Sequence, residues 1–566
     1  TRPSGRMPLL LSLNEVPFIL TMKAMRKLEF NFYDLFSRWL KPACASLLAL
    51  LALGTPAQLE AQSGEDVEVI VNVLPQGSMK FDAEALYRED QEVIQGVLGS
   101  SKNDVVDALE ILPAGHIIMA GYIGSGSSIL ADRPRLGCSE PNARSGPFIA
   151  VTDGKFRKLY RVAFLPSSFA RIREIRIAED GSVFLGGESP QGSGDQGLAV
   201  MKLPPKLQEV TWQANTRGDE MSGMALMADG SVVVAPNKHP FITRIKADGS
   251  GLMPFGEALA FRTDGKNPQV RQKWWSDQRY SQSGVATASY HRGNAGGVAT
   301  TRDGNLVFFT SNFVKHKSGS PDFDPMLIKF TPEGEILWAT HLLEGLPALS
   351  DHKSPQLYVC PYSGDIIASM RQHGHFETNL QVGPNAFLTT DNWLTGNIMI
   401  GWIGRIDAAT GRVKAGTMYF PDMGRPPSGG KRTANSLFPD VIRTDREGNI
   451  YVAGRAAYKL EATLHAFQSE KMGDTGFISV FDASLTRLRY ANLITGDGYS
   501  FRPTALVVTE LGPLVATTIG LKRGSKSRPR LVPSNTDKTN FLTDRSVGDS
   551  DILLTLLPSA PWKESW

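Results

Sequence analysis

One short pattern recurs along the chain, a polar turn containing glycine followed by a strand rich in β-branched residues. Copies are "AEDGSVFLGG" at 178–187, "MADGSVVVAP" at 227–236, "TRDGNLVFFT" at 301–310 and "DREGNIYVAG" at 445–454. Glycine supplies the positive φ of a tight turn, so each copy predicts a β-hairpin. A hairpin repeated this often constrains the fold strongly, because such units bury their apolar faces only against one another.

Each unit continues with a second pair of strands, as in "PMLIKFTPEGEILWATHL" at 325–342 and "GFISVFDASLTRLRYANLI" at 476–494. The spacing of the units, 49 to 84 residues, varies only in the loops. We therefore predict an all-β fold, a seven-bladed β-propeller of four-stranded antiparallel blades. The seven predicted hairpin turns contain Gly115, Gly181, Gly230, Gly304, Gly364, Gly448 and Gly512.

The end of the chain leaves the seventh unit one strand short after "SDILLTLL" at 550–557. We predict that an N-terminal strand, "DVEVIVNVL" at 66–74, closes the ring, with a free N-terminal arm as the alternative. Beyond the leader, only residues 82–98 have an apolar spacing that fits a helix. The predicted organisation is upstream sequence and leader at 1–61, a segment with the closing strand at 62–104, and the propeller at 105–566.

The N-terminal region resembles a secretory signal peptide. Basic residues at 23–41 precede the apolar run "ACASLLALLAL" at 43–53 and the small residues of "GTPAQLEAQ", with cleavage expected after Ala57 or Ala61. The alternative is a short amphipathic membrane anchor. We expect a secreted protein, extracellular or periplasmic, with no membrane span in the mature chain because the apolar run is too short. Without residues 1–61 the chain has 53 basic and 53 acidic residues, which gives no indication of a nucleic-acid partner.

Catalytic and cofactor motifs are absent from the sequence. It contains no GxSxG, HExxH or CxxCH pattern, and only Cys138 and Cys360 lie beyond the leader. His373 and His375 in "RQHGHF" are weak candidates for a metal, because no third ligand is nearby in the sequence. We therefore predict no cofactor and no metal.

Unit six resembles a known bacterial family. "DREGNIYVAG" followed by "HAFQSEKMGDTGFISVFDASLTRLRYANLITGDG" is similar to the SBBP (seven-bladed β-propeller) repeat, and unit five resembles it in part. In units one to four only the skeleton is similar. The resemblance implies a secreted or envelope propeller, and it brings no shared catalytic residues.

Strand order in a propeller blade places the connections between second and third strands, and those between blades, on one face. Long loops rich in charge are expected to carry binding there. The long connections fall on this face at 123–146, 256–293, 311–324, 371–397, 421–436, 455–475 and 521–548.

Two of these loops are candidate binding sites, the first because it combines basic and aromatic residues and the second because it is strongly basic. Aromatic rings beside cations suit a sugar face or an anionic polymer, whereas a small satellite core or a solvated loop are the alternatives. The candidate ligand-binding residues are Arg271, Lys273, Trp274, Trp275, Tyr280, His291 and Arg292 in the first loop, and Lys522 and Arg523 in the second.

These features predict a monomeric binding or interaction module for an extracellular or envelope polymer, or for a surface protein. The alternative is a polysaccharide lyase or hydrolase that acts at the channel mouth. For that activity Tyr290, His291, Arg292 and Arg371 are the residues expected to converge.

Overall fold

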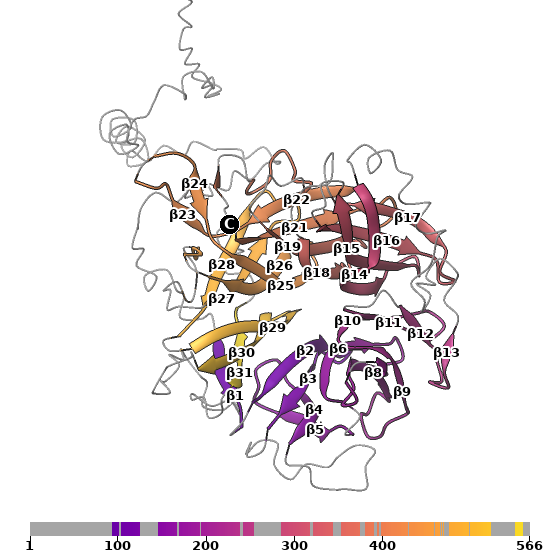
Figure 1. Ribbon diagram of the computed structural model, residues 1–566. Helices are drawn as coiled ribbons and strands as arrows, with labels where there is room; N and C mark the ends of the chain where they lie inside the picture. Colours follow the sequence, from indigo (N-terminus) through magenta and orange to yellow (C-terminus); the bar gives the residue numbers. More distant parts are fainter. Residues whose placement is uncertain are drawn as a thin grey trace, which may run out of the picture. The chain divides into compact units, whose positions relative to one another are not determined.

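The computed structural model describes residues between 93 and 558, except for connecting segments of which the longest are 125–144, 254–284, 343–351 and 522–549. The described residues form 31 strands and no helix. Seven four-stranded antiparallel sheets follow one another around a ring (Figure 1). The predicted all-β, seven-bladed β-propeller is therefore confirmed.

The first strand of each sheet is the innermost. It contacts the first strands of the two neighbouring blades, and β2 contacts both β6 and β29, so the ring is closed. These strands are β2 (Val105–Ile111), β6 (Arg171–Ile177), β10 (Met221–Leu226), β14 (Val285–Thr300), β18 (His352–Val359), β25 (Leu437–Thr444) and β29 (Tyr499–Thr509).

Each sheet continues outward from its first strand in antiparallel order. The second strands are β3 (Ile117–Ile123), β7 (Val183–Glu188), β11 (Val232–Pro236), β15 (Leu306–His316), β19 (Ile366–His373), β26 (Ile450–Ala456) and β30 (Gly512–Leu521). The third are β4 (Gly146–Thr152), β8 (Gly194–Leu203), β12 (Thr243–Ile245), β16 (Pro321–Phe330), β21 (Met399–Ile406), β27 (Thr475–Phe481) and β31 (Ser550–Leu556). The outermost are β5 (Leu159–Phe164), β9 (Trp212–Gly218), β13 (Leu252–Met253), β17 (Ile336–His341), β22 (Val413–Tyr419), β28 (Leu488–Ile494) and β1 (Ile94–Leu98).

The hydrophobic core is divided among the junctions between blades. Seven clusters of buried side chains are present, and each joins two consecutive sheets. The cluster of blades two and three, for example, contains Phe184 and Val200 from one and Met224 and Val234 from the other. Every sheet is therefore buried on both faces by its neighbours, which explains why a single unit has no core of its own.

The hairpin turns lie where the sequence predicts them. All seven glycines of these turns have positive φ, from 77° at Gly304 to 130° at Gly512. Six of them lie between the first and second strands of their blades, and Gly512 is the first residue of β30. In this region of backbone conformation a side chain is strained, so the glycines fix the turns of the repeat.

The ring is closed by an N-terminal strand, as expected, but not by the residues that the sequence indicated. β1 supplies the fourth strand of the last blade and pairs with β31, with Ile94 opposite Leu556 and Leu98 opposite Ile552. Residues 66–74 lie outside the described residues. The possible helix at 82–98 is wrong in its last turn, because 94–98 is the closing strand and Ile94, Val97 and Leu98 are buried in it.

Some of the predicted long loops are shorter than expected. Most of 311–324 belongs to a hairpin of β15 and β16, and β14 begins at Val285 within the loop predicted at 256–293. Part of the expected loop is therefore strand, because β15 and β16 stay paired as far as Lys315 and Pro321. A small additional sheet forms from β20 (Trp393–Leu394), β24 (Arg432–Ala434) and β23 (Asp422–Gly424).

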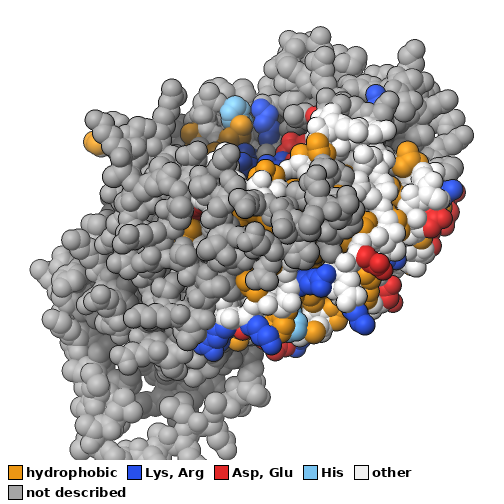
Figure 2. All heavy atoms as spheres, turned by 90° about the horizontal axis from the view of Figure 1, so that it is seen from below, with side chains coloured by type: hydrophobic (Ala, Val, Ile, Leu, Met, Phe, Trp, Pro, Cys, Tyr) orange, Lys and Arg blue, Asp and Glu red, His pale blue; other side chains and the backbone are white. Residues whose placement is uncertain are grey.

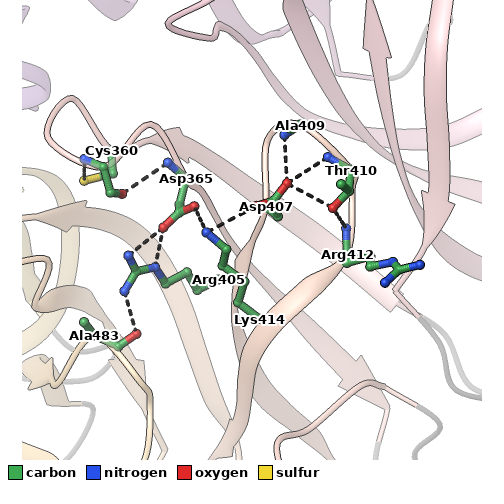
Figure 3. A network of polar contacts seen from close by, with 10 residues as sticks. Cys360, Asp365, Arg405, Asp407, Ala409, Thr410, Arg412, Lys414 and Ala483 are labelled. Atoms are coloured by element: carbon green, nitrogen blue, oxygen red, sulfur yellow. Dashed lines mark hydrogen bonds and ion pairs between the residues drawn. The ribbon is translucent and has the colours of Figure 1, made fainter.

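A repeated ionic contact links blades three to six. A basic residue of the third strand forms an ion pair of 2.6 Å with an aspartate of its own blade's first turn and donates to a backbone carbonyl of the next blade. Figure 3 shows one of these clamps, in which Asp365 also accepts from Lys414. The clamps are Arg244 with Asp229 and the Pro332 carbonyl, Lys329 with Asp303 and the Ala408 carbonyl, and Arg405 with Asp365 and the Ala483 carbonyl.

Candidate binding site at the channel mouth

The innermost strands share an irregularity that faces the centre of the ring. In each of the seven, the register with the second strand shifts by an extra residue, and β14 has two further shifts. Bulges of this kind re-aim side chains and are frequent beside binding sites. The extra residues, all of which line a central cavity of about 710 Å³, are Asp107, Arg173, Ser222, Gly296, Ser354, Pro355, Asp440 and Thr504.

The local sequence explains why the bulges form. Pro439 and Pro503 stand at the bulges of blades six and seven, where a residue without an N–H removes no regular ladder bond. On the facing strand, a Cβ on Gly454 would lie 1.9 Å from the carbonyl oxygen of Phe438. A Cβ on Gly121 or on Gly187 would likewise lie 1.9 Å from the carbonyl oxygen of the opposite strand. The glycine that ends "GNIYVAG" is thus required by the close approach of the bulged strand.

One side of the cavity mouth carries an aspartate shared by two arginines. Arg371 Nη2 donates to Asp440 Oδ1 at 2.6 Å, and Arg455 Nε donates to Asp440 Oδ2 at 2.8 Å. Both guanidinium groups also stack on the Phe438 ring, at 4.5 and 5.0 Å from its centroid. Burial lowers the pKa of Arg371. The arrangement fixes two cations in place while only one carboxylate neutralises them.

The opposite side carries two more arginines on β6. Arg171 binds Asp107 through two hydrogen bonds. Burial lowers the pKa of Arg171, but the bond to Asp107 and the negative charges of Asp107, Glu188 and Glu220 together outweigh burial, so the pKa is raised. Arg173 donates to Glu188 at 2.6 Å and to Glu220 at 2.8 Å, which ties blade two to blade three. These bidentate and bridging contacts hold the arginine side chains in fixed orientations.

Arg502 of β29 lies between the two aspartates, in the blade between those of Asp440 and Asp107. It is exposed in the cavity, and it makes no ion pair or hydrogen bond with the residues that the structure describes. Although Arg502 faces the cavity, its position inside the ring removes it partly from water, which lowers the pKa of Arg502, and the positive charge of Arg455 lowers it further. Arg502 is therefore a charged group, as arginine is at all ordinary pH values, whose surroundings compensate its charge incompletely.

The mouth with these arginines opens on the face predicted to bear the long loops. Arg171 and Arg502 stand near the starts of first strands, and Arg371 and Arg455 near the ends of second strands. The chain enters first strands and leaves second strands on the same face. The connections 254–284 and 522–549, which contain most of the predicted binding residues, join strand ends on that face.

The structure places only part of the predicted site. Arg371 lies at the cavity mouth, where the sequence placed it as one member of the enzymatic alternative. Its predicted neighbours His291 and Arg292 belong to β14, of which the side chains in this part are not described. Outside the described residues lie Arg271, Lys273, Trp274, Trp275, Tyr280, Lys522 and Arg523.

The weak metal candidate is not brought together with other ligands in the described part of the chain. His373 ends β19 and is half-buried, and His375 lies outside the description. Among the described residues no group of three or more histidine, cysteine, aspartate or glutamate side chains is placed to hold a metal ion. A search of the same residues for a helix long and apolar enough to cross a bilayer finds none.

Comparisons with known proteins add little beyond the fold. No protein-family model matches the sequence, and no curated protein matches it. Among solved structures, hydrazine synthase of Kuenenia stuttgartiensis aligns with 78% of this chain and 100% of its own, at 10% identity and a TM-score of 0.37. U3-55K aligns with 82% of this chain and 98% of its own at 9% identity and a TM-score of 0.38. The WD40 repeats of RRP9 align with 83% and 100%, at 8% identity and a TM-score of 0.37.

Such low similarity carries no inference about activity, and membership of the SBBP repeat family stays a prediction. Fold and site together define a seven-bladed β-propeller with an arginine-rich channel mouth. β-Propellers are scaffolds on which many different binding functions are built, so the function has to be argued from the site.

Proposed function

We propose that this propeller is a secreted binding module for an anionic extracellular or envelope polymer, and that its binding surface is the loop-bearing face around the channel mouth. The observation that carries the proposal is the charge of the arc formed by Arg371, Arg455, Arg502 and Arg171. With Arg173, which also stands at the mouth, these guanidinium groups number five, and they face four carboxylates, so one positive charge is in excess; the carboxylates are those of Asp107, Glu188, Glu220 and Asp440. A concave site with an excess of fixed positive charge attracts and orients anionic ligands.

The rest of the visible described surface differs from the mouth. On the face in Figure 2, basic, acidic and hydrophobic side chains are interspersed among the described residues, without a large area of one kind. Mixed surfaces of this type are typical of solvated protein exteriors. The described side chains on this face therefore form no comparable concentration of arginine.

The predicted loops support the same ligand class. Basic and aromatic residues at 271–280 and basic residues at 522–523 belong to connections that start and end on the face of the arginine arc. A polymer that crosses this face would meet cations both in the loops and at the channel mouth. The predicted signal peptide agrees with an extracellular or periplasmic polymer.

The lyase or hydrolase alternative would use the same mouth. Of the residues that this activity requires, the structure describes the side chain of Arg371, which donates a hydrogen bond to Asp440 and stacks on the Phe438 ring. Such contacts position a charge for binding and do not distinguish a catalytic role. Binding is thus the function that the geometry supports best.

Co-sedimentation tests the proposal. The purified protein is mixed with insoluble acidic polysaccharide, polygalacturonate beads, and with neutral cellulose, at low and at high salt. We expect retention on the acidic polymer that decreases as salt rises, because the interaction is electrostatic and partly exposed. Equal retention on cellulose, or none on either polymer, would contradict an anionic polymer as the ligand and favour a protein partner.

A double variant tests the predicted loop. Trp274→Ala with Trp275→Ala should weaken retention on the acidic polymer while the melting temperature stays close to that of the wild type. If the two rings instead form a small core beneath the loop, the double variant will melt earlier. Thermal unfolding followed by circular dichroism separates the two results.

A further inference from the structure

The arginine arc has an uneven distribution of partners. Arg171 has Asp107 to itself, and Arg371 and Arg455 share Asp440. Arg502 lies between these two carboxylates and is bonded to neither of them. One guanidinium group of the arc therefore keeps all its hydrogen-bond donors available to the cavity, as far as the described residues are concerned.

The neighbours of Arg502 keep it in this state. Asp107 is 5% exposed and Asp440 12% exposed, and the arginines bonded to them are held by several contacts each. Each of these carboxylates already accepts at least two charge-assisted hydrogen bonds from arginines other than Arg502. The backbone holds Arg502 as well, because Pro503 follows it at the bulge and Thr504 Oγ1 donates to the Val106 carbonyl of blade one.

We infer that Arg502 is the subsite for one oxyanion group, the carboxylate or sulfate of an acidic saccharide, that enters the channel from the loop face. The inference rests on the proposed function and names the group of the polymer that is recognised. A guanidinium fork matches such a group with two parallel hydrogen bonds, and the charges of Arg455 and Arg171 stand on either side. Because the site lies in a cavity within the ring, it suits a chain end or a short oligosaccharide.

Titration calorimetry with matched short probes tests the subsite in the full chain. The probes are the trimer of galacturonate, the trimer of galactose as the neutral match, and inorganic sulfate. We expect the galacturonate trimer to bind and the galactose trimer not to bind. Competition by sulfate would show that a tetrahedral oxyanion also fits, whereas its absence would restrict the subsite to carboxylate.

Variants locate the binding. Arg502→Gln should lower the affinity for the galacturonate trimer about 10- to 100-fold, the range expected for the loss of a charge-assisted hydrogen bond. Arg502→Lys should restore part of the affinity because it keeps the charge without the fork. Arg446→Gln is the matched control, since Arg446 is an exposed arginine of a hairpin turn on the opposite face. The affinity of Arg446→Gln for the galacturonate trimer should equal that of the wild type.

The results separate this inference from the proposed function. If the polymer is retained in co-sedimentation and Arg502→Gln binds the trimer as tightly as Arg446→Gln does, the subsite is refuted while the binding module stands. If the wild type binds the trimer through Arg502 but no polymer is retained, the subsite stands and the polymer proposal fails. If Arg502→Gln unfolds early, Arg502→Lys takes its place: an affinity for the trimer below that of the wild type supports the subsite, and an equal affinity refutes it. Binding of acidic peptides in place of the saccharide trimers would refute the saccharide class.

Discussion

The closing strand gives the most direct test of the fold. Ile94 is fully buried in β1, within the cluster that joins the last blade to the first. Ile94→Ala removes three carbon atoms from this cluster, at about 0.8 kcal/mol each for transfer, and leaves a cavity. We therefore expect the free energy of unfolding to fall by about 3 kcal/mol. Urea denaturation followed by tryptophan fluorescence measures this as a lower midpoint.

A second variant discriminates between the closing strand of the structure and the one the sequence indicated. Ile70→Ala alters the apolar segment 66–74, whose expected place in the last blade is occupied by β1. We expect its midpoint to stay near that of the wild type, within about 0.5 kcal/mol. A loss of stability in Ile70→Ala with none in Ile94→Ala would refute the closure described above.

Three further predictions concern single contacts. Lys329→Met should lower the free energy of unfolding by about 2 kcal/mol at pH 7, because it removes the buried donor to Asp303 and to the next blade. The Lys329 bond holds the pKa of Asp303 below its usual range, so in urea melts the difference from wild type should shrink as pH falls below about 4. Gly454→Ala should destabilise the fold by about 1–3 kcal/mol, since its Cβ would meet the Phe438 carbonyl, and thermal melting checks this. Burial, assisted by the charge of Asp551, raises the pKa of Asp104 to about 6, so folding takes up a proton there. Deprotonation of Asp104 should therefore lower the free energy of unfolding as pH rises from about 4 to about 6. Urea melts across that range should show no such contribution in Asp104→Asn.

The repeat pattern predicted most of the fold, because the turn glycines mark every blade. Gly181, Gly304 and Gly448 fall in turns with positive φ. Glycine adopts this backbone conformation at little cost, whereas other residues are strained in it. The closing strand was misassigned for a physical reason. Its sequence IQGVL contains a glutamine and a glycine and lacks the alternation of a typical strand, yet Gln95 is satisfied by a hydrogen bond of 3.0 Å to Thr555. Tertiary pairing decided the structure of a segment whose local preference was weak.

The channel mouth was only partly accessible from the sequence. Charged residues such as Asp107, Asp440 and Arg502 lie far apart in the chain, and only the ring closure brings them together. A signal was nevertheless present. Proline stands within the first strands at 439 and 503, and within a sheet proline is confined to edge strands, strand starts and bulges. Asp440, Arg502 and Thr504, which stand beside these prolines, line the cavity.

The measurement that tests the central claim most directly is a crystal structure of the protein with the galacturonate trimer. The account predicts a carboxylate of the trimer within hydrogen-bonding distance of the Arg502 guanidinium, at the channel mouth of the loop face. A trimer bound on the opposite face or on the outer strands, with Arg502 making no contact, would contradict it.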